Sequence, residues 1–371
     1  MPRRPELALN AIAPYFTMFP LDFPMGILEQ HAKPADPVLD PFCGRGTTSF
    51  AARALGLESV GIDTNTVAAA ITASKLVAAE PEAIVEEARR IIGSATPDGL
   101  PSGAFWELAY HPETLGVLCR LRTGLLADHE GAARTALRAI VLGALHGPRN
   151  KRSTSYFSNQ APRTYAPKPG YAVGFWERHG LQPPHVDVLA VIRRRAEHYY
   201  ARTPPPRGHL VQGDSRQRAT LEQARRHITG RQTGFAWIVT SPPYYGMRTY
   251  GPDQWLRAWF LGGPATVQYR SEDHLSHRSP TAFARDLGAV WRNVADVARE
   301  HARMVIRFGA IGDRAVTPMA VIEESLMATG WTIESEFDAG SAHQGRRQAD
   351  AFLRSRSKAI AEVDVWCRLE A

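Results

Sequence analysis

One stretch near the start of the chain most constrains the fold, because two strand patterns there flank a glycine turn and a helix. Val38 and Leu39 begin the stretch, and the residues DPFCGRGTT turn the chain. SFAARALG then reads as a helix, and SVGIDTN reads as a second strand that ends in an acid. This spacing is typical of a β–α–β unit with a short crossover turn. It predicts a layered α/β fold.

Strand and helix patterns alternate again in the second half of the chain. GHLVQGDS, FAWIVTSPPYYG and MVIRFG read as strands, and residues 283–297 have the three-to-four spacing of an amphipathic helix. Thr317 and Pro318 predict the start of another helix, and Gly330 predicts its C-cap. WTIESEF and EVDVWCRL alternate like an antiparallel pair. We therefore predict an α/β, Rossmann-like, doubly wound and mostly parallel sheet with a closing antiparallel strand pair.

A different kind of sequence separates these two α/β parts. It begins with helical patterns and becomes basic, aromatic and rich in proline at HGPRNKRSTSYFSNQAPRTYAPKPGYAVGFW. That segment is too aromatic for a free linker and has too many prolines for a sheet core. We predict three parts: residues 1–95 with the first half of a ligand-binding domain, a helical insertion at 96–207, and residues 208–371 with the second half.

Composition limits the class of protein. The chain has 371 residues, a hydrophobic share of 44%, a charged share of 22% and a net charge of +7, which excludes a disordered chain and permits a polyanionic partner. Cys43, Cys119 and Cys367 are too widely spaced for a disulfide framework or a zinc knuckle, and no histidine has ligand spacing with them. We expect no metal. No apolar run approaches the ~20 residues of a membrane span, and no secretory signal is visible, so we expect a cytoplasmic protein.

The glycine turn predicts a ligand site. Gly44 and Gly46 allow the backbone to turn tightly and to approach a ligand. Asp40 would repel phosphate and no Gly-Lys-Ser/Thr follows, so a nucleoside triphosphate is disfavoured. Asp63, at the end of the second strand, can accept hydrogen bonds from two ribose hydroxyls. A ligand with a ribose and a cationic amine fits best, such as S-adenosylmethionine, with a dinucleotide as the alternative.

A second motif, TSPPY, ends the FAWIV strand. Its two prolines remove N–H donors, so the turn presents acceptors. The Ser241 hydroxyl and the Pro242 carbonyl can converge on one NH₂ group, with Tyr244 as a flat face beside them. Accepting protons from an exocyclic amine makes its nitrogen more nucleophilic, as methylation of that amine requires.

DPFCGRGTT followed downstream by TSPPY resembles the amino-group DNA methyltransferases, which modify N4 of cytosine or N6 of adenine. The resemblance covers most of the chain outside the insertion, and it implies S-adenosylmethionine as cofactor, S-adenosylhomocysteine as product and double-stranded DNA as partner. It implies that the glycine loop and Asp40 hold the methionine end, Asp63 the ribose and Asp214 the adenine amine. The implied cofactor-binding residues are Phe19, Pro20, Asp40, Phe42, Cys43, Gly44, Gly46, Thr47, Asp63 and Asp214. The implied catalytic residues are Ser241, Pro242, Pro243 and Tyr244.

Serine at the first motif position, preceded by threonine, is more typical of the cytosine-N4 branch of that family. We therefore expect direct methyl transfer to N4 of a flipped cytosine, without a metal, with a cognate restriction endonuclease as a candidate partner. Adenine N6 methylation is the nearest alternative, and a non-catalytic DNA-binding specificity subunit is the alternative from another class. RNA guanine methylation stays open. Cytosine C5 methylation is disfavoured because none of the cysteines adjoins a proline.

Two basic and aromatic stretches are candidates for DNA contacts, one in the insertion and one near the C-terminus. A further arginine follows the TSPPY motif and could line a DNA cleft. The candidate DNA-binding residues are Arg149, Lys151, Arg152, Tyr156, Asn159, Arg163, Lys168, Arg248, Arg346 and Arg347.

Overall fold

The chain folds into two compact units in a computed structural model, which describes residues 4–15, 19–147, 155–161, 168–228, 234–245, 250–268, 275–309, 317–341 and 361–370. The first, here called the helical unit, comprises Met1–Tyr15, Val77–Pro204 and Thr249–Ser271. The second, the sheet unit, comprises Phe16–Leu76, Pro205–Arg248 and Glu272–Ala371. The helical unit thus begins earlier than the insertion predicted at 96–207, and it includes two stretches from elsewhere in the chain.

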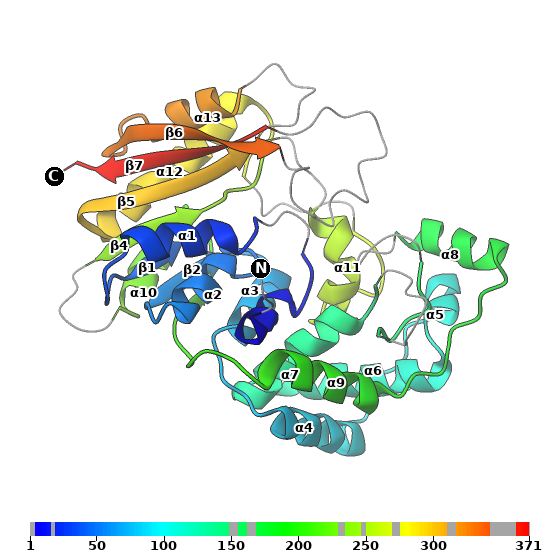
Figure 1. Cartoon of the computed structure of the whole chain (residues 1–371). Helices are drawn as coiled ribbons and strands as arrows, with labels where there is room; N and C mark the ends of the chain where they lie inside the picture. The colour runs from blue at the N-terminus through cyan, green and yellow to red at the C-terminus, as the bar shows by residue number, and fades with distance from the viewer. Residues whose placement is uncertain are drawn as a thin grey trace. The chain divides into compact units, whose positions relative to one another are not determined.

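The sheet unit is built on a seven-stranded sheet with the order β3-β2-β1-β4-β5-β7-β6 (Figure 1). Its strands are β1 Val38–Asp40, β2 Ser59–Asp63, β3 His209–Gln212, β4 Phe235–Thr240, β5 Ala298–Gly309, β6 Trp331–Ser341 and β7 Ala361–Leu369. Neighbours from β3 to β5 are parallel, and β7 is antiparallel to both β5 and β6. This confirms the expected α/β, mostly parallel sheet with a closing antiparallel pair.

Helices cover both faces of this sheet. They are α1 Asp22–His31, α2 Thr47–Ala54, α3 Thr66–Ser74, α10 Arg218–Arg225, α12 Pro280–Val297 and α13 Pro318–Leu326. Successive strand residues point to opposite faces. Val38 therefore packs in the cluster with residues of α1 and α2, whereas Leu39 packs in the cluster with residues of α10, α12 and α13. Burial on both faces explains why β1 and β4 are apolar without alternation up to their last residues, Asp40 and Thr240.

The helical unit contains a short 3-10 helix, η1, and seven α-helices among its described residues. Their bounds are η1 Pro5–Ala11, α4 Pro81–Ser94, α5 Ala104–Ala109, α6 Pro112–Ala127, α7 Ala132–Ala144, α8 Pro169–Arg178, α9 Val188–Tyr200 and α11 Tyr250–Phe260. Aromatic side chains tie α5 to α11, since the ring centroids of Trp106 and Trp259 lie 4.6 Å apart. The Trp106 indole N–H also donates to the carbonyl of Ala265 at 3.1 Å. Nowhere in the described chain does a helix combine the length and the apolar character that crossing a membrane requires.

One predicted helix end differs from the one observed. Thr317 caps α13 as predicted, because its hydroxyl accepts from the Ala320 N–H at 3.3 Å. However, α13 ends at Leu326 with Met327 as its C-cap, because Ala328 adopts a positive φ of 55° and turns the chain. Gly330, the predicted C-cap, lies after this turn, directly before β6.

Candidate active site

The candidate site lies where the order of the sheet reverses. The chain moves outward from β1 through β2 to β3, and it then returns to form β4 on the other side of β1. In open parallel sheets, ligands bind outside the carboxyl ends of the strands at such a switch point. Asp40 ends β1 and Thr240 ends β4, so both predicted motifs begin at this position in the fold.

A direct hydrogen bond joins the two strand ends. The Thr240 hydroxyl donates to Asp40 Oδ1 at 2.7 Å, and the Phe42 N–H donates to the same oxygen at 3.2 Å. Asp40 is 1% exposed, and its Oδ2 atom accepts no hydrogen bond from any described residue. Burial raises the pKa of Asp40 to about 6, although the hydrogen bond from Thr240 opposes the shift.

The glycine turn has the backbone geometry that its sequence predicts. Gly44 and Gly46 have positive φ values of 52° and 72°, and the Gly46 N–H donates to the Cys43 carbonyl at 2.7 Å. Gly46 is the N-cap of α2 and offers no side-chain acceptor to the first turn of that helix. An added Cβ at Gly44 would meet nothing closer than the Phe42 carbonyl at 4.0 Å. The turn therefore leaves open space beside Gly44.

Asp63 at the end of β2 holds this turn in place. Its Oδ2 atom accepts from the Gly44 N–H and its Oδ1 atom accepts from the Asn65 N–H, both at 2.8 Å. Burial raises the pKa of Asp63 to about 6, opposed by these two hydrogen bonds. Asp63 thus has a structural role at the glycine turn that the sequence did not predict, beside its predicted role toward a ribose.

A third turn, which follows β3, contacts the chain directly after β1. The Ser215 hydroxyl donates to the Pro41 carbonyl at 2.8 Å, which ties this turn to the residue after Asp40. The neighbouring Asp214 pairs with Arg216, whose Nη2 atom lies 2.7 Å from Asp214 Oδ2. Partial burial favours the neutral acid, but the hydrogen bonds from Arg216 dominate and lower the pKa of Asp214. Asp214 is therefore an ionised acceptor near the glycine turn.

The remaining predicted cofactor residues differ in their surroundings. Cys43 is 4% exposed, and its side chain packs over Gly61, where an added Cβ would come within 2.9 Å of the Cys43 Cβ atom. Thr47 is buried in the first turn of α2. Phe42 lies edge-on to Trp291 with ring centroids 5.9 Å apart. Phe19 packs against Phe23, and Pro20 beside it is exposed.

The TSPPY motif begins at the end of β4 and carries the hydroxyl groups of Ser241 and Tyr244. Ser241 is partly exposed, and no described residue makes a hydrogen bond to its hydroxyl. The Tyr244 hydroxyl donates to Glu362 Oε1 at 2.9 Å, and its ring lies edge-on to Phe308 with centroids 5.5 Å apart. Glu362 belongs to β7 and is 3% exposed. This contact was not predictable from the sequence, because an acid that begins an alternating strand resembles an exposed residue.

Only three of the predicted DNA-binding residues lie among the described ones, all in the helical unit. Lys168 is exposed, and the ring of Tyr156 lies under the Arg195 guanidinium at 5.3 Å. Asn159 is 7% exposed, and its side-chain amide donates to the Leu108 carbonyl at 3.1 Å, so it is an interior polar group. The other predicted residues, which lie outside the described ranges, are Arg149, Lys151, Arg152, Arg163, Arg248, Arg346 and Arg347.

The described groups fit S-adenosylmethionine on their own geometry. Asp40 supplies a buried carboxylate oxygen that accepts no hydrogen bond from the residues that the structure describes, and a cationic group would satisfy it. The backbone at Gly44 borders open space, and Asp63 and Asp214 supply acceptors at the ends of the neighbouring strands β2 and β3. Each Asp63 oxygen accepts one hydrogen bond and keeps capacity for another, as a ribose hydroxyl would need.

A family model matches one part of this chain. Residues 3–74 match the family model N6_N4_Mtase, described as DNA methylase. The matched segment contains the glycine turn, Asp40 and Asp63. No curated protein matches the chain.

Several solved methyltransferase structures are also similar. The rRNA methyltransferase AviRa from Streptomyces viridochromogenes aligns with a TM-score of 0.37 and 12% identity, over 99% of this chain and 94% of AviRa. A SAM-dependent methyltransferase from Methanosarcina mazei aligns with a TM-score of 0.34 and 10% identity, over 96% and 99% of the two chains. TrmN from Thermus thermophilus aligns with a TM-score of 0.36 and 10% identity, over 97% of this chain and 52% of TrmN.

Proposed function

We propose that this protein transfers a methyl group from S-adenosylmethionine to the exocyclic N4 amine of cytosine in double-stranded DNA. The observation that carries the proposal is the hydrogen bond between Asp40 and Thr240. It fixes the glycine turn and the Ser-Pro-Pro-Tyr turn side by side at the switch point of the sheet. The DNA methylase match over residues 3–74 supports the same activity.

The cofactor half of the site uses the ends of β1, β2 and β3. Asp40 accepts from the cationic methionine end, and Asp63 accepts from the ribose hydroxyls. Asp214 accepts from the adenine amine, which requires Arg216 to share that carboxylate. The bound cofactor supplies an electrophilic methyl carbon, so the transfer needs no metal and no covalent enzyme intermediate.

The target half of the site is the turn after β4. The Ser241 hydroxyl and the Pro242 carbonyl accept hydrogen bonds from the two amine N–H groups of the target base, which increases the nucleophilicity of its nitrogen. As the new N–C bond forms, the C–S bond of the cofactor breaks, S-adenosylhomocysteine leaves, and the surplus amine proton passes to solvent. Tyr244 provides a face against which the base stacks, and Glu362 holds the hydroxyl of that ring. Because this nitrogen is unreachable inside a duplex, the base must leave the helix. Alignment within the site supplies most of the rate enhancement.

The test is to incubate the purified chain with S-adenosylmethionine and unmethylated duplex DNA of mixed sequence, and to weigh the nucleosides after complete digestion. We expect N4-methylcytosine. N6-methyladenine alone would overturn the choice of base while leaving amino-group methylation intact. A Ser241→Ala preparation purified in parallel controls for contaminating methylases.

A non-catalytic DNA-binding subunit predicts a different result. Equilibrium binding of labelled S-adenosylmethionine then shows no saturation at micromolar protein, and neither methylated base forms. Single-molecule sequencing of DNA from cells that express the chain would give the recognition sequence. That recognition sequence is also needed to test the two proposed partners, which are double-stranded DNA and a cognate restriction endonuclease.

A further inference from the structure

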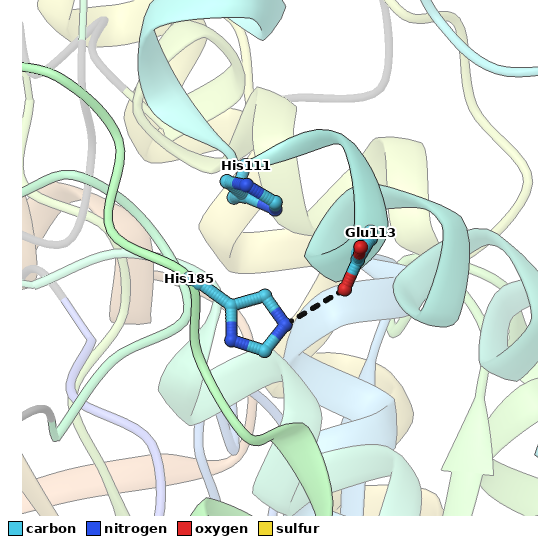
Figure 2. Close-up of side chains that lie close together, drawn as sticks. All are labelled: His111, Glu113 and His185. Carbon is cyan, nitrogen blue, oxygen red and sulfur yellow. Dashed lines mark hydrogen bonds and ion pairs between the residues drawn. The ribbon is translucent and has the colours of Figure 1, made fainter.

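Three potential metal ligands converge in the helical unit, in a region that the methyl-transfer proposal does not use. His111 is the N-cap of α6, Glu113 lies in the first turn of α6, and His185 lies in the loop before α9. Their ligand atoms all lie within 4.8 Å of one another. Figure 2 shows the two imidazole rings and the carboxylate turned toward one another. Sequence spacing did not reveal this group, because His185 is distant along the chain.

The loop that carries His185 is fixed against α6 by its neighbouring residue. The Thr114 hydroxyl accepts from the Val186 N–H at 3.2 Å and lies 3.5 Å from the Val186 carbonyl. Thr114 is 1% exposed, so these contacts are shielded from water. His185 and Glu113 are thereby held together whether or not anything binds them. Binding a ligand between them requires little ordering of the loop.

The contacts within the cluster leave imidazole nitrogen atoms available to coordinate a metal. His185 Nε2 lies 2.9 Å from Glu113 Oε2, and the rings of His111 and His185 are edge-on with centroids 5.0 Å apart. The Nδ1 atom of His111 is buried and has no hydrogen-bond partner among the described residues. No contact of Nδ1 therefore fixes the tautomer of that ring, and a neutral imidazole can offer either nitrogen to a metal.

We propose that His111, Glu113 and His185 form a binding site for a divalent transition metal of the zinc type. Two imidazoles and one carboxylate are a ligand set that suits ions of the zinc type better than it suits Ca²⁺ or Mg²⁺. Tetrahedral zinc with ligands at about 2.0–2.1 Å requires ligand atoms about 3.3 Å apart. The three ligand atoms, which lie within 4.8 Å of one another, would move closer by side-chain rotation when the ion binds. Water completes the coordination.

The placement of the cluster indicates what the metal does. Glu113 and His185 are 75% and 60% exposed, so the site is at the surface of the unit, where an isolated pair of this kind contributes little stability. A metal held by both segments links the start of α6 to the loop before α9. The positive end of the α6 dipole opposes the bound cation, and the Glu113 carboxylate offsets this effect. The site therefore acts as a structural clip.

The test uses the full-length chain, stripped of metal by a chelator and titrated with Co²⁺ and then Zn²⁺. We expect one equivalent of Co²⁺ to give the intense visible bands of four-coordinate cobalt, which Zn²⁺ then displaces. Zinc should also raise the melting temperature, because it binds the folded state. His111→Ala and His185→Ala should each lose the bands and the zinc-dependent shift.

Two control variants make the result specific. His198→Ala removes an exposed histidine from α9 outside the cluster, and it should bind as the wild type does. His209 and His227 stack in the sheet unit with centroids 4.5 Å apart, so His227→Ala tests this pair as an adventitious site. The proposal is overturned by the absence of saturable binding, or by bands that survive in both cluster variants. Loss of binding in His227→Ala alone also overturns it.

Discussion

The side chains of Asp40 and Thr240 are joined by a hydrogen bond of 2.7 Å across the boundary between β1 and β4. Both residues are almost completely buried. They are 200 positions apart in the sequence, yet they hold together the two turns on which the proposed chemistry depends. A change at either residue therefore affects both stability and ligand binding, and the two effects can be measured separately.

Replacing Thr240 by valine tests this contact directly. Thr240→Val keeps the shape of the side chain but removes the donor to Asp40 Oδ1, and a hydrogen bond to a charged group contributes about 1.5–3 kcal/mol. We expect a loss of that order in the free energy of unfolding at pH 8, measured in urea. Thr240→Ser keeps the hydroxyl and should lose less. A larger loss in Thr240→Ser than in Thr240→Val would mean that the methyl group of Thr240, not its hydroxyl, determines the effect.

The buried charge of Asp40 should destabilise the cofactor-free protein, although the same charge should strengthen cofactor binding. Burial raises the pKa of Asp40 from 3.8 to about 6 in the folded chain. Between these values the folded state binds the proton more tightly than the unfolded chain does, so the free energy of unfolding falls as the pH rises through this window. Above pH 6 the destabilisation is complete, at about 3 kcal/mol for a shift of about two pH units.

Asp40→Asn should therefore stabilise the cofactor-free protein at pH 7.5 and have little effect near pH 4. Asp63 has a pKa raised in the same direction, but it is present in both proteins and cancels in the comparison. The measurement is thermal unfolding of both proteins across this pH range. The same variant should bind S-adenosylmethionine at least about tenfold more weakly, since it lacks the negative charge. A variant that is stabilised at pH 4 but not at pH 7.5 would contradict the assigned burial of the charge.

The sheet could be predicted from the sequence because its signals are local. Strands buried on both faces, such as β4 with FAWIVT, are continuous apolar runs, whereas β7 alternates as the closing strand. The glycine turn was predictable for the same reason, since Gly44 and Gly46 adopt the positive φ values that only glycine adopts readily.

Contacts between distant segments were not predictable from these patterns. The bond from Tyr244 to Glu362 and the group of His111, Glu113 and His185 both depend on how separate elements pack. Asn159 shows that a local pattern can also predict a surface contact for a side chain that is buried. A polar residue in a basic, aromatic segment resembles a DNA contact, but its amide satisfies carbonyl groups inside the helical unit.

Ser241→Ala should separate binding from turnover. The Ser241 hydroxyl makes no hydrogen bond to a described residue, so its removal should leave folding and cofactor affinity unchanged. Loss of one acceptor from the target amine should reduce kcat by about 10²–10³, as for other groups that act on a developing charge. Single-turnover rates with labelled cofactor measure this effect. An unchanged rate would remove Ser241 from the chemistry, and Ser94→Ala, in an exposed position on α4, provides the matched control.

Tyr244→Phe should test the role of Glu362. The variant keeps the ring and its packing against Phe308 but loses the donor to Glu362 Oε1. Removal of one hydrogen bond worth about 1 kcal/mol should reduce kcat/KM about fivefold. Tyr244→Ala should lose more, since stacking contributes about 1–3 kcal/mol per base. Glu362→Gln keeps an acceptor and should retain most activity. If Tyr244→Phe and Glu362→Gln were equally impaired, the charge of Glu362 would matter more than its hydrogen bond.

Gly46 and Gly56 form a matched pair for testing the glycine turn, because both have a φ of 72°. Alanine at either position adopts a left-handed conformation, which costs about 1–2 kcal/mol. Around Gly56 an added Cβ meets no atom within 4 Å, whereas at Gly46 it would lie 2.7 Å from Thr72 Cγ2. The Thr72 hydroxyl donates to the Gly44 carbonyl at 2.9 Å, so Gly46→Ala should also displace the turn itself. We therefore expect Gly56→Ala to lose only stability in urea, and Gly46→Ala to lose more stability together with cofactor affinity in equilibrium binding. Equal stability losses and an unchanged affinity in Gly46→Ala would show that the turn tolerates a side chain at this position.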